Sequence, residues 1–401
     1  MKIALVAQHA TSMTGDSAGR LNDTRLRELS HSLAGEGHRV TVYAQRNGAA
    51  AQSARTEIEP GVTVEYVGPS SGRRPAGTDT SDQAESELLA QVPAFSRPLH
   101  ERWTADRPDV VHAMRWTSGL ASLAAARDLR IPVVQSFDSL GVAERRHHVI
   151  PGDAGTERIR LEPAIGRSAS AVLAGSSDEQ SDLTRLGVPR RHIRVVPCGV
   201  DTDEFTPEGP AAERAARPRL VTVADLSETD ALANLLRAIS KVPGADLIVA
   251  GGPSRDQLRD DLGYHRLVKL ADSLGVTSQV TFAGQVGQGA LPPLFRSADL
   301  LVSVTEYDPT GLTSIQAMAC GTPVIASAVG AQVDAVVDGT TGILVPPGRP
   351  ALLAQRIRQL LQHPMLLEAF SVAAADRARS RYSWSRIAHE TVSVYDTALA
   401  A

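Results

Sequence analysis

Residues Val302 to Ser327 read VSVTEYDPTGLTSIQAMACGTPVIAS, and this stretch decides the fold that the sequence predicts. The apolar run from Leu300 to Ser303 predicts a short buried strand, and a turn follows it from Asp308 to Gly311. Apolar residues then recur at helical spacing, at Leu312, Ile315, Met318 and Ala319. Val324 to Ala326 predicts a second buried strand. The order strand, turn, helix, strand is typical of a parallel α/β sheet.

The turn from Asp308 to Gly311 follows a strand and opens a helix. At such a place the free backbone N–H groups and the positive end of the helix dipole favour an anion. Gln316 lies eight residues after Asp308, about two helical turns on, so it falls on roughly the same side of the helix. The sequence therefore predicts that backbone amides from Asp308 to Thr313 bind a sugar or a phosphate, through Pro309, Thr310, Gly311, Leu312 and Thr313.

The same alternation of strands and helices continues along the chain. In the first half, buried strands are predicted at Lys2–Ala7, Val40–Tyr43, Val62–Val67, Asp109–His112, Val133–Ser136, Ala171–Ala174 and Ile193–Val196. In the second half they are predicted at Leu220–Val223, Leu247–Ala250, Val280–Ala283, Leu300–Ser303, Val324–Ala326 and Gly342–Val345. The main predicted helices are Leu21–Leu33, Gly119–Leu129, Glu157–Arg167, Pro350–Arg381 and Trp384–Leu399.

Pro197 to Pro210 interrupts this alternation and is the candidate linker. We therefore expect two doubly wound α/β domains, at residues 1–200 and 201–381, and a last helix at residues 382–401. Ser70–Ser81 and Arg145–Gly155 are predicted loops.

Composition is that of an ordinary globular protein. The 401 residues are 42% hydrophobic and 21% charged, and the net charge of −4 gives no reason to expect nucleic acid or an anionic membrane as a partner. No run approaches the roughly 18 apolar residues that span a bilayer. The first residues, MKIALVAQHA, predict a buried strand rather than a signal peptide, because no long apolar region follows. We expect a cytoplasmic protein.

The two cysteines, Cys198 and Cys320, lie in different halves of the chain. We therefore expect each to be a small packed residue, with no disulfide framework. His147 and His148 have no partner at the spacing of a metal site, so no metal is predicted.

The run from Asp308 to Val324 resembles the signature of retaining glycosyltransferases of family 4, which have the GT-B fold. Their pattern is an acidic residue, seven residues, Glu, and then Ala-Met-Ala-x-Gly-x-Pro-Val. Residues 317–324 match it closely, while Asp308 and Gln316 replace its two glutamates. The resemblance implies two Rossmann-like domains facing a central cleft, with the last helix crossing back to the first domain. It also implies a nucleotide-sugar donor in the second domain, a small-molecule acceptor in the first, retention, and no cofactor or obligatory metal.

Two further family positions on the donor side are altered. Where the family has an Arg and a Lys for the donor diphosphate, this chain has Asp225 and Asp230. Two interpretations of these aspartates stay open: they are solvated acids, or they contact a positively charged or hydroxyl-rich ligand. The family's glycine loop near the N-terminus corresponds to Gly19 and Arg20. Arg20 and Arg115 are the candidates to replace the missing phosphate contacts, and exposed surface arginines are the alternative.

On the acceptor side, Asp138 stands where the family has a histidine at a strand end. It could accept a sugar hydroxyl or take a proton, and with Asp308 it is the predicted catalytic residue; a helix-capping aspartate is the alternative. His112, Arg115 and Trp116 follow another predicted strand and are the predicted acceptor-binding residues, although His112 equally fits a histidine at the edge of the core.

Two functions follow from these departures. The first is a glycosyltransferase with an unusual donor or acceptor, such as a thiol or an amine, in antibiotic or other specialised-metabolite biosynthesis. The second is a degenerate family member that binds or regulates without catalysis. The sequence leaves the sugar, the base, the acceptor and the oligomeric state open, a homodimer included.

Overall fold

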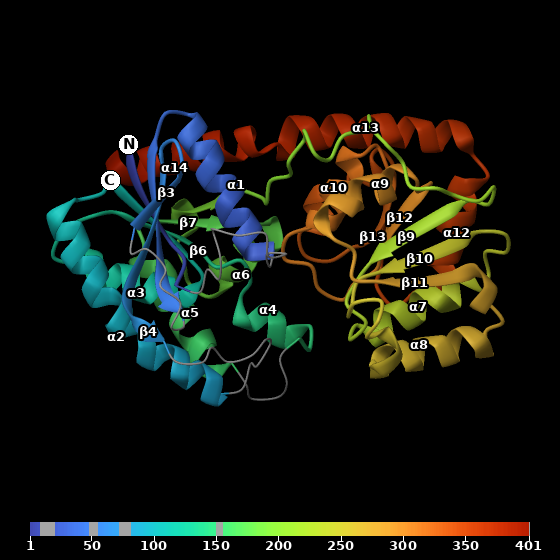
Figure 1. Ribbon diagram of the computed structural model, residues 1–401, viewed down its shortest axis with the longest axis horizontal. Helices are drawn as coiled ribbons and strands as arrows, with labels where there is room; N and C mark the ends of the chain where they lie inside the picture. The colour runs from blue at the N-terminus through green and yellow to red at the C-terminus, as the bar shows by residue number, and fades with distance from the viewer. Residues whose placement is uncertain (9–20, 48–54, 72–81, 150–154, 401) are drawn as a thin grey trace. The chain divides into compact units, whose positions relative to one another are not determined.

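The computed structural model describes residues 1–8, 21–47, 55–71, 82–149 and 155–400 (Figure 1). The chain divides into two compact units, Met1–Cys198 with Trp384–Ala401, and Gly199–Ser383. The predicted domain boundaries, after residues 200 and 381, lie close to these divisions. No helix within the described ranges is both long and apolar enough to cross a membrane.

The first unit is built on an eight-stranded sheet in the order β3-β4-β2-β1-β5-β6-β7-β8. All neighbouring strands are parallel except β3 and β4. The strands are β1 (Lys2–Val6), β2 (Arg39–Asn47), β3 (Arg55–Glu59), β4 (Val62–Ser71), β5 (Val110–Met114), β6 (Val133–Ser136), β7 (Ala171–Ala174) and β8 (Ile193–Val195). The helices are α1 (Leu21–Gly35), α2 (Asp82–Ala105), α3 (Trp116–Ala126), α4 (Gly141–Arg146), α5 (Thr156–Ser168), α6 (Ser177–Arg185) and α14 (Trp384–Ala400).

Strands β5, β6 and β7 are buried along their whole length, which explains why they read as unbroken apolar runs. Helix α14 packs on α1 and reaches the sheet, where the Tyr395 hydroxyl lies 2.7 Å from Nδ1 of His112 on β5. The predicted return of the last helix to the first domain is therefore confirmed.

The second unit contains a six-stranded sheet, entirely parallel, in the order β11-β10-β9-β12-β13-β14. Its strands are β9 (Arg219–Val223), β10 (Asp246–Ala250), β11 (Val280–Gly284), β12 (Leu300–Ser303), β13 (Val324–Ser327) and β14 (Gly342–Val345). Its α-helices are α7 (Thr229–Ile239), α8 (Leu262–Ser273), α9 (Leu291–Arg296), α10 (Leu312–Ala319), α11 (Gln332–Ala335), α12 (Pro350–Leu361) and α13 (Pro364–Tyr382). Every strand predicted for this half is present.

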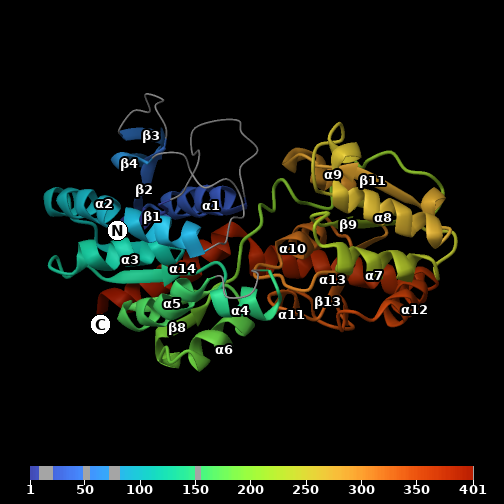
Figure 2. The same ribbon diagram turned by 90° about the horizontal axis from the view of Figure 1, so that it is seen from below.

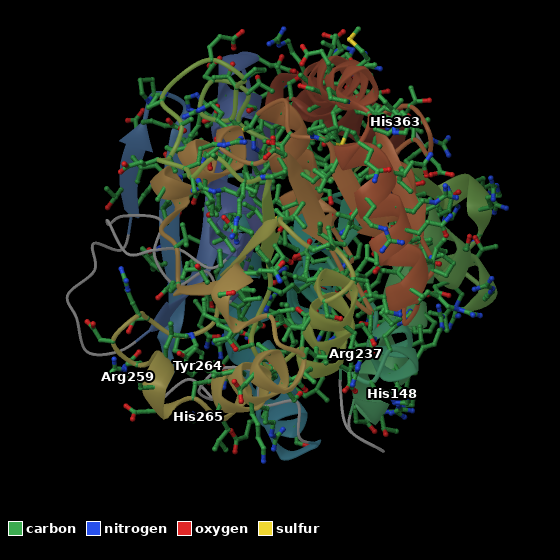
Figure 3. The ribbon with its side chains drawn as sticks, turned by 90° about the vertical axis from the view of Figure 1, so that its right-hand side faces the viewer. His148, Arg237, Arg259, Tyr264, His265 and His363 are labelled. Carbon is green, nitrogen blue, oxygen red and sulfur yellow. The ribbon has the colours of Figure 1, made fainter. Side chains whose placement is uncertain are left out.

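Two helical layers cover this second sheet. Helix α7 contacts both α8 and α12, and α10 contacts both α9 and α13. In Figure 1, α7 and α8 lie on one side of the strands and α9, α10 and α13 on the other, and Figure 2 views the same unit from the side of α7 and α8. On α8, the Tyr264 ring stands edge-on to Phe282 of β11, with ring centroids 5.3 Å apart. The neighbouring His265 bonds through Nε2 to the carbonyl oxygen of Arg259 at 2.7 Å, which ties α8 to the segment before it (Figure 3).

The structure corrects four sequence predictions. Helix α2 was missed, because Pro93 and Pro98 lie inside it and proline removes a helical N–H. Strand β3, which pairs with β4 at the edge of the sheet, was also missed. The predicted loop at Arg145 begins inside α4, and the helix expected from Pro350 to Arg381 is two helices separated at Gln362 and His363.

Candidate active site

Helix α10 begins just beyond the carboxyl end of β12, at the turn that the sequence predicts as the donor site. Gly311 takes the position before the helix with φ of 65°, a left-handed conformation that glycine adopts without strain. A Cβ atom there would lie 3.3 Å from the carbonyl oxygen of Ala331, so the turn packs closely against the segment that leads into α11.

The carboxylate of Asp308 closes this turn. Its Oδ1 accepts hydrogen bonds from the backbone N–H groups of Thr310 at 3.0 Å and Gly311 at 2.7 Å. Its Oδ2 accepts one from Nε2 of Gln332 at 2.8 Å. These two amides therefore already have an acceptor within the turn, and their contact with a ligand stays a prediction; Pro309 has no N–H to offer.

The first turn of α10 still presents donors. The N–H groups of Thr313 and Ser314 have no acceptor among the residues that the structure describes, as expected for the start of a helix. Leu312 N–H makes only a long contact of 3.3 Å with the Thr310 hydroxyl. Gln316 is half-buried in the same helix, and its proposed contact with ribose stays a prediction.

Asp225 and Asp230 are both exposed, on the loop after β9 and at the start of α7. Strands β9 and β12 are neighbours in the sheet, so this loop and the Asp308 loop leave the same edge side by side. Asp225 uses Oδ1 to accept from the Ser227 N–H at 2.8 Å, which stabilises its own turn. The structure thus brings the two aspartates to the predicted donor edge.

Glu228, at the end of the loop after β9, was not predicted as a site residue. Its Oε2 accepts a hydrogen bond from the Thr305 hydroxyl at 3.0 Å, which links the loop after β9 to the loop after β12. Burial raises the pKa of Glu228, and the charges of Asp225 and Asp308 add to this effect. Three carboxylates thus influence one another here, and a further negative charge is unfavourable at this edge.

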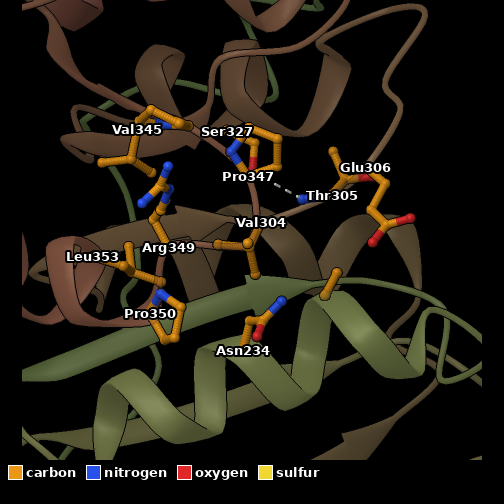
Figure 4. A pocket seen from close by; sticks show the side chains of 13 residues that line it. Asn234, Val304, Thr305, Glu306, Ser327, Val345, Pro347, Arg349, Pro350 and Leu353 are labelled. Carbon is orange, nitrogen blue, oxygen red and sulfur yellow. Dashed lines mark hydrogen bonds between the residues drawn. The ribbon is translucent and has the colours of Figure 1, made fainter.

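A small pocket adjoins the same loops (Figure 4). Thr305 and Glu306 line it after β12, Asn234 lines it from α7, and Arg349 from the start of α12. The Thr305 N–H donates to Oγ of Ser327 at 3.3 Å beside it. No sequence motif indicates Asn234 or Arg349, because segments far apart in the chain bring them together at this pocket.

In the first unit, Asp138 follows β6 in a left-handed conformation with φ of 66°. Its Oδ1 forms an ion pair with the guanidinium of Arg25 on α1 at 2.6 Å, and both side chains are largely buried. Burial opposes the charge of Arg25, but Asp138 together with Cys198 and Glu179 outweighs this effect, so the pKa of Arg25 is raised. The predicted catalytic carboxylate is therefore paired with a cation that the sequence analysis did not identify.

Glu179 on α6 joins the same group. Ser176 caps this helix, because its Oγ accepts from the Glu179 N–H at 3.1 Å. The Glu179 Oε2 accepts from the Gly175 N–H at 2.6 Å, while its buried Oε1 has no hydrogen-bond partner among the residues that the structure describes. Burial raises the pKa of this carboxyl to about 7, and the charge of Asp138 contributes.

Of the predicted acceptor-binding residues, two are buried and one is exposed. His112 is only 1% exposed, with Nδ1 bonded to Tyr395 and Nε2 bonded to Oγ of Ser136 at 2.8 Å. Burial lowers its pKa to about 3, so it is a neutral core residue and the ligand-contact prediction is wrong. Trp116 is buried at the start of α3. Arg115, just before it, is exposed with φ of 70° and stays a candidate.

A second buried network holds the segment after β6. Arg158 donates through Nε to Glu162 at 2.6 Å and through one terminal nitrogen to Glu144 at 2.9 Å. Its other terminal nitrogen donates to the carbonyl oxygen of Ser139 at 2.7 Å. Burial opposes the charge of Arg158, yet the two carboxylates raise its pKa. This arginine fixes the loop that carries Asp138. Two other predicted residues, Gly19 and Arg20, lie outside the described residues.

Comparison with known proteins identifies the family. The family model "Glycosyl transferases group 1" matches residues 209–377, and "Glycosyltransferase Family 4" matches residues 23–204. The D-inositol 3-phosphate glycosyltransferase of Streptomyces avermitilis is 31% identical over 429 residues, covering 100% of this chain and 88% of that protein. The chain belongs to family 4 of the glycosyltransferases. The enzyme class predicted from the signature is thus confirmed.

Other relatives and solved structures are similar to the chain over most of its length. The D-inositol 3-phosphate glycosyltransferase of Mycobacterium tuberculosis is 34% identical over 379 residues, covering 90% of this chain and 75% of that protein. Sucrose-phosphate synthase from Thermosynechococcus elongatus has a TM-score of 0.81 at 25% identity, covering 100% of this chain and 99% of that one. Anabaena HepE in complex with UDP has a TM-score of 0.72 at 19% identity, covering 99% and 100%, and shows the fold alone. The predicted GT-B fold class is confirmed.

Proposed function

We propose that this family 4 glycosyltransferase transfers a sugar from a nucleotide-sugar donor to a small-molecule acceptor, with retention at the anomeric carbon. The observation that carries the donor assignment is the start of α10, where the free N–H groups of Thr313 and Ser314 face the carboxyl edge of the sheet. The known complex of HepE with UDP supports a nucleoside diphosphate as the ligand. The nucleotide sugar is a substrate, and the proposed reaction needs no metal or other cofactor.

The acceptor is proposed to bind the first unit at the ends of β5 and β6, near Arg115 and Asp138. Two acceptor classes compete. The relatives' names support a phosphorylated cyclitol. The acids in place of family residues, Asp138 among them, support a thiol or an amine from an antibiotic or other specialised-metabolite pathway. Mass spectrometry of reactions with each acceptor class and a panel of nucleotide sugars distinguishes these classes.

Calorimetric titration with UDP, GDP and ADP tests the donor site. We expect one of these nucleotides to bind the wild-type protein, and Gln316→Ala to weaken that binding about tenfold through loss of a hydrogen-bonding amide at the ribose. Gln359→Ala, an exposed glutamine on α12, is the control and should bind as the wild type does. Unchanged affinity in Gln316→Ala would contradict this placement, and binding without any turnover would favour the non-catalytic alternative.

A further inference from the structure

Gln332 is a buried residue that connects three elements around the α10 turn. It is the first residue of α11 and has no exposed surface. Its Nε2 donates to Oγ of Ser303, at the end of β12, at 2.7 Å. The same nitrogen donates to Oδ2 of Asp308 at 2.8 Å, and its Oε1 accepts from the Ser314 hydroxyl at 2.6 Å. Both N–H groups of this amide therefore donate a hydrogen bond, and its oxygen accepts one.

The orientation of the Gln332 amide is fixed by chemistry. Only a donor can face the carboxylate of Asp308, so the nitrogen must point there and the oxygen must point to Ser314. A buried amide that satisfies all of its hydrogen bonds holds a single arrangement, because any rotation leaves polar groups unpaired in a low-dielectric interior.

The position of Asp308 depends on this amide. Its carboxylate accepts from Thr310 N–H and Gly311 N–H on one oxygen and from Gln332 on the other. Its carbonyl oxygen also accepts from the Ala331 N–H at 2.8 Å, immediately before Gln332. The carboxylate is thus held on the Thr310 and Gly311 amides, which precede the free N–H groups of α10.

We propose that Gln332 is a positioning residue for the donor site: by binding Oδ2 of Asp308 it keeps that negative charge on the turn and leaves the start of α10 open to an anionic group of the donor. The proposal rests on the proposed function, since it assumes that a nucleotide binds at α10. Without the Gln332 contact, the carboxylate would gain a water-exposed orientation toward the helix start. There it would repel the donor, because like charges at a partly buried site interact strongly.

The test uses two substitutions in the full chain. Gln332→Met keeps a similar volume and removes the amide. Gln332→Glu replaces it by a carboxyl that can donate to Asp308 only when it is protonated. Two carboxyls in contact share one proton, and burial together with the charges of Asp308 and Glu228 raises the pKa of the new group. The Gln332→Glu protein should therefore resemble the wild type at low pH and Gln332→Met at high pH.

Hydrogen exchange measured without ligand reports directly on the turn. We expect the protection factors of the Thr310 and Gly311 amides to fall at least tenfold in Gln332→Met and to recover at low pH in Gln332→Glu. Ser314→Ala is the control, because it removes another partner of Gln332 but leaves the contact with Asp308 in place. It should retain protection at both amides. Unchanged protection in Gln332→Met would overturn the proposal.

Nucleotide titration completes the test. The nucleotide that the wild type binds should bind Gln332→Met at least tenfold more weakly, and Gln332→Glu with a pH dependence that the wild type lacks. Loss of amide protection with unchanged nucleotide affinity would overturn the positioning role, because Gln332 would then stabilise the turn alone. A wild-type protein that binds no nucleotide would contradict the proposed function itself, and the exchange measurement distinguishes this outcome from failure of the Gln332 contact.

Discussion

Several side chains that the sequence predicts as ligand contacts form hydrogen bonds or ion pairs with other residues of the protein. Asp138 pairs with Arg25, and Asp308 caps its own turn and accepts from Gln332. His112 is bonded on both ring nitrogens. Apart from the bonds of Asp308 within its own turn, these partners are 24 to 283 residues away in sequence, so local motifs could not predict the pairs. The sequence therefore shows which of these positions carry a charge. Which partner each side chain contacts is determined only by the fold.

Glu179 gives a prediction on pH dependence. Burial raises the pKa of its carboxyl to about 7 from an ordinary value near 4.5, so the folded state binds the proton more tightly than the unfolded chain does. Its contribution to the free energy of unfolding is therefore present at low pH and falls as pH rises toward 7. Glu179→Gln should remove this fall, and the variant should gain stability relative to the wild type between pH 5 and pH 8.

Urea unfolding at the two pH values measures this effect. The control is Asp178→Asn, which also removes a negative charge from the first turn of α6 and so changes the helix-dipole interaction in the same way. The account would be contradicted if Glu179→Gln and Asp178→Asn showed the same pH dependence of stability.

Elements were more predictable than contacts. The six strands of the second unit read as apolar runs between glycine or proline signals, and all six are present. Helix α2 was hidden by its two prolines, and β3 by its polar composition at a sheet edge. Helix α10 was found at its predicted place, but which of its turn amides are free could not be predicted, because that depends on Asp308 and Gln332.

The turn before α10 gives a prediction on stability. Gly311→Ala should lower the free energy of unfolding by about 1–2 kcal/mol, because alanine is strained at φ of 65°. Contact of the new methyl group with the Ala331 carbonyl oxygen, 3.3 Å away, adds to this loss. Gly348→Ala is the matched control, since Gly348 has φ of 68° and no atom within 4 Å of an added Cβ. A larger loss in Gly348→Ala than in Gly311→Ala would contradict the packing of this turn.

The whole chain combines a preserved fold with an altered charge pattern. Matches along its full length place it in family 4, and each unit has a largely or wholly parallel sheet whose carboxyl edge carries predicted site residues. At the donor edge of the second unit, however, Asp225, Glu228 and Asp308 concentrate negative charge beside the predicted diphosphate position. The sequence identified the fold and these replacements, but it could not show that Glu228 bonds to Thr305 on the neighbouring loop.

The most direct test of this account is nucleotide affinity in Asp225→Arg combined with Asp230→Lys, compared with the wild type by calorimetry at low and physiological salt. We expect the double substitution to increase affinity at least about tenfold, and less so at higher salt, because two negative charges become positive at the donor edge. Asp272→Arg with Asp376→Lys makes the same charge change at exposed positions on α8 and α13 and should leave affinity nearly unchanged. Equal affinity in the wild type and the Asp225–Asp230 variant would contradict the claim that these aspartates face the donor.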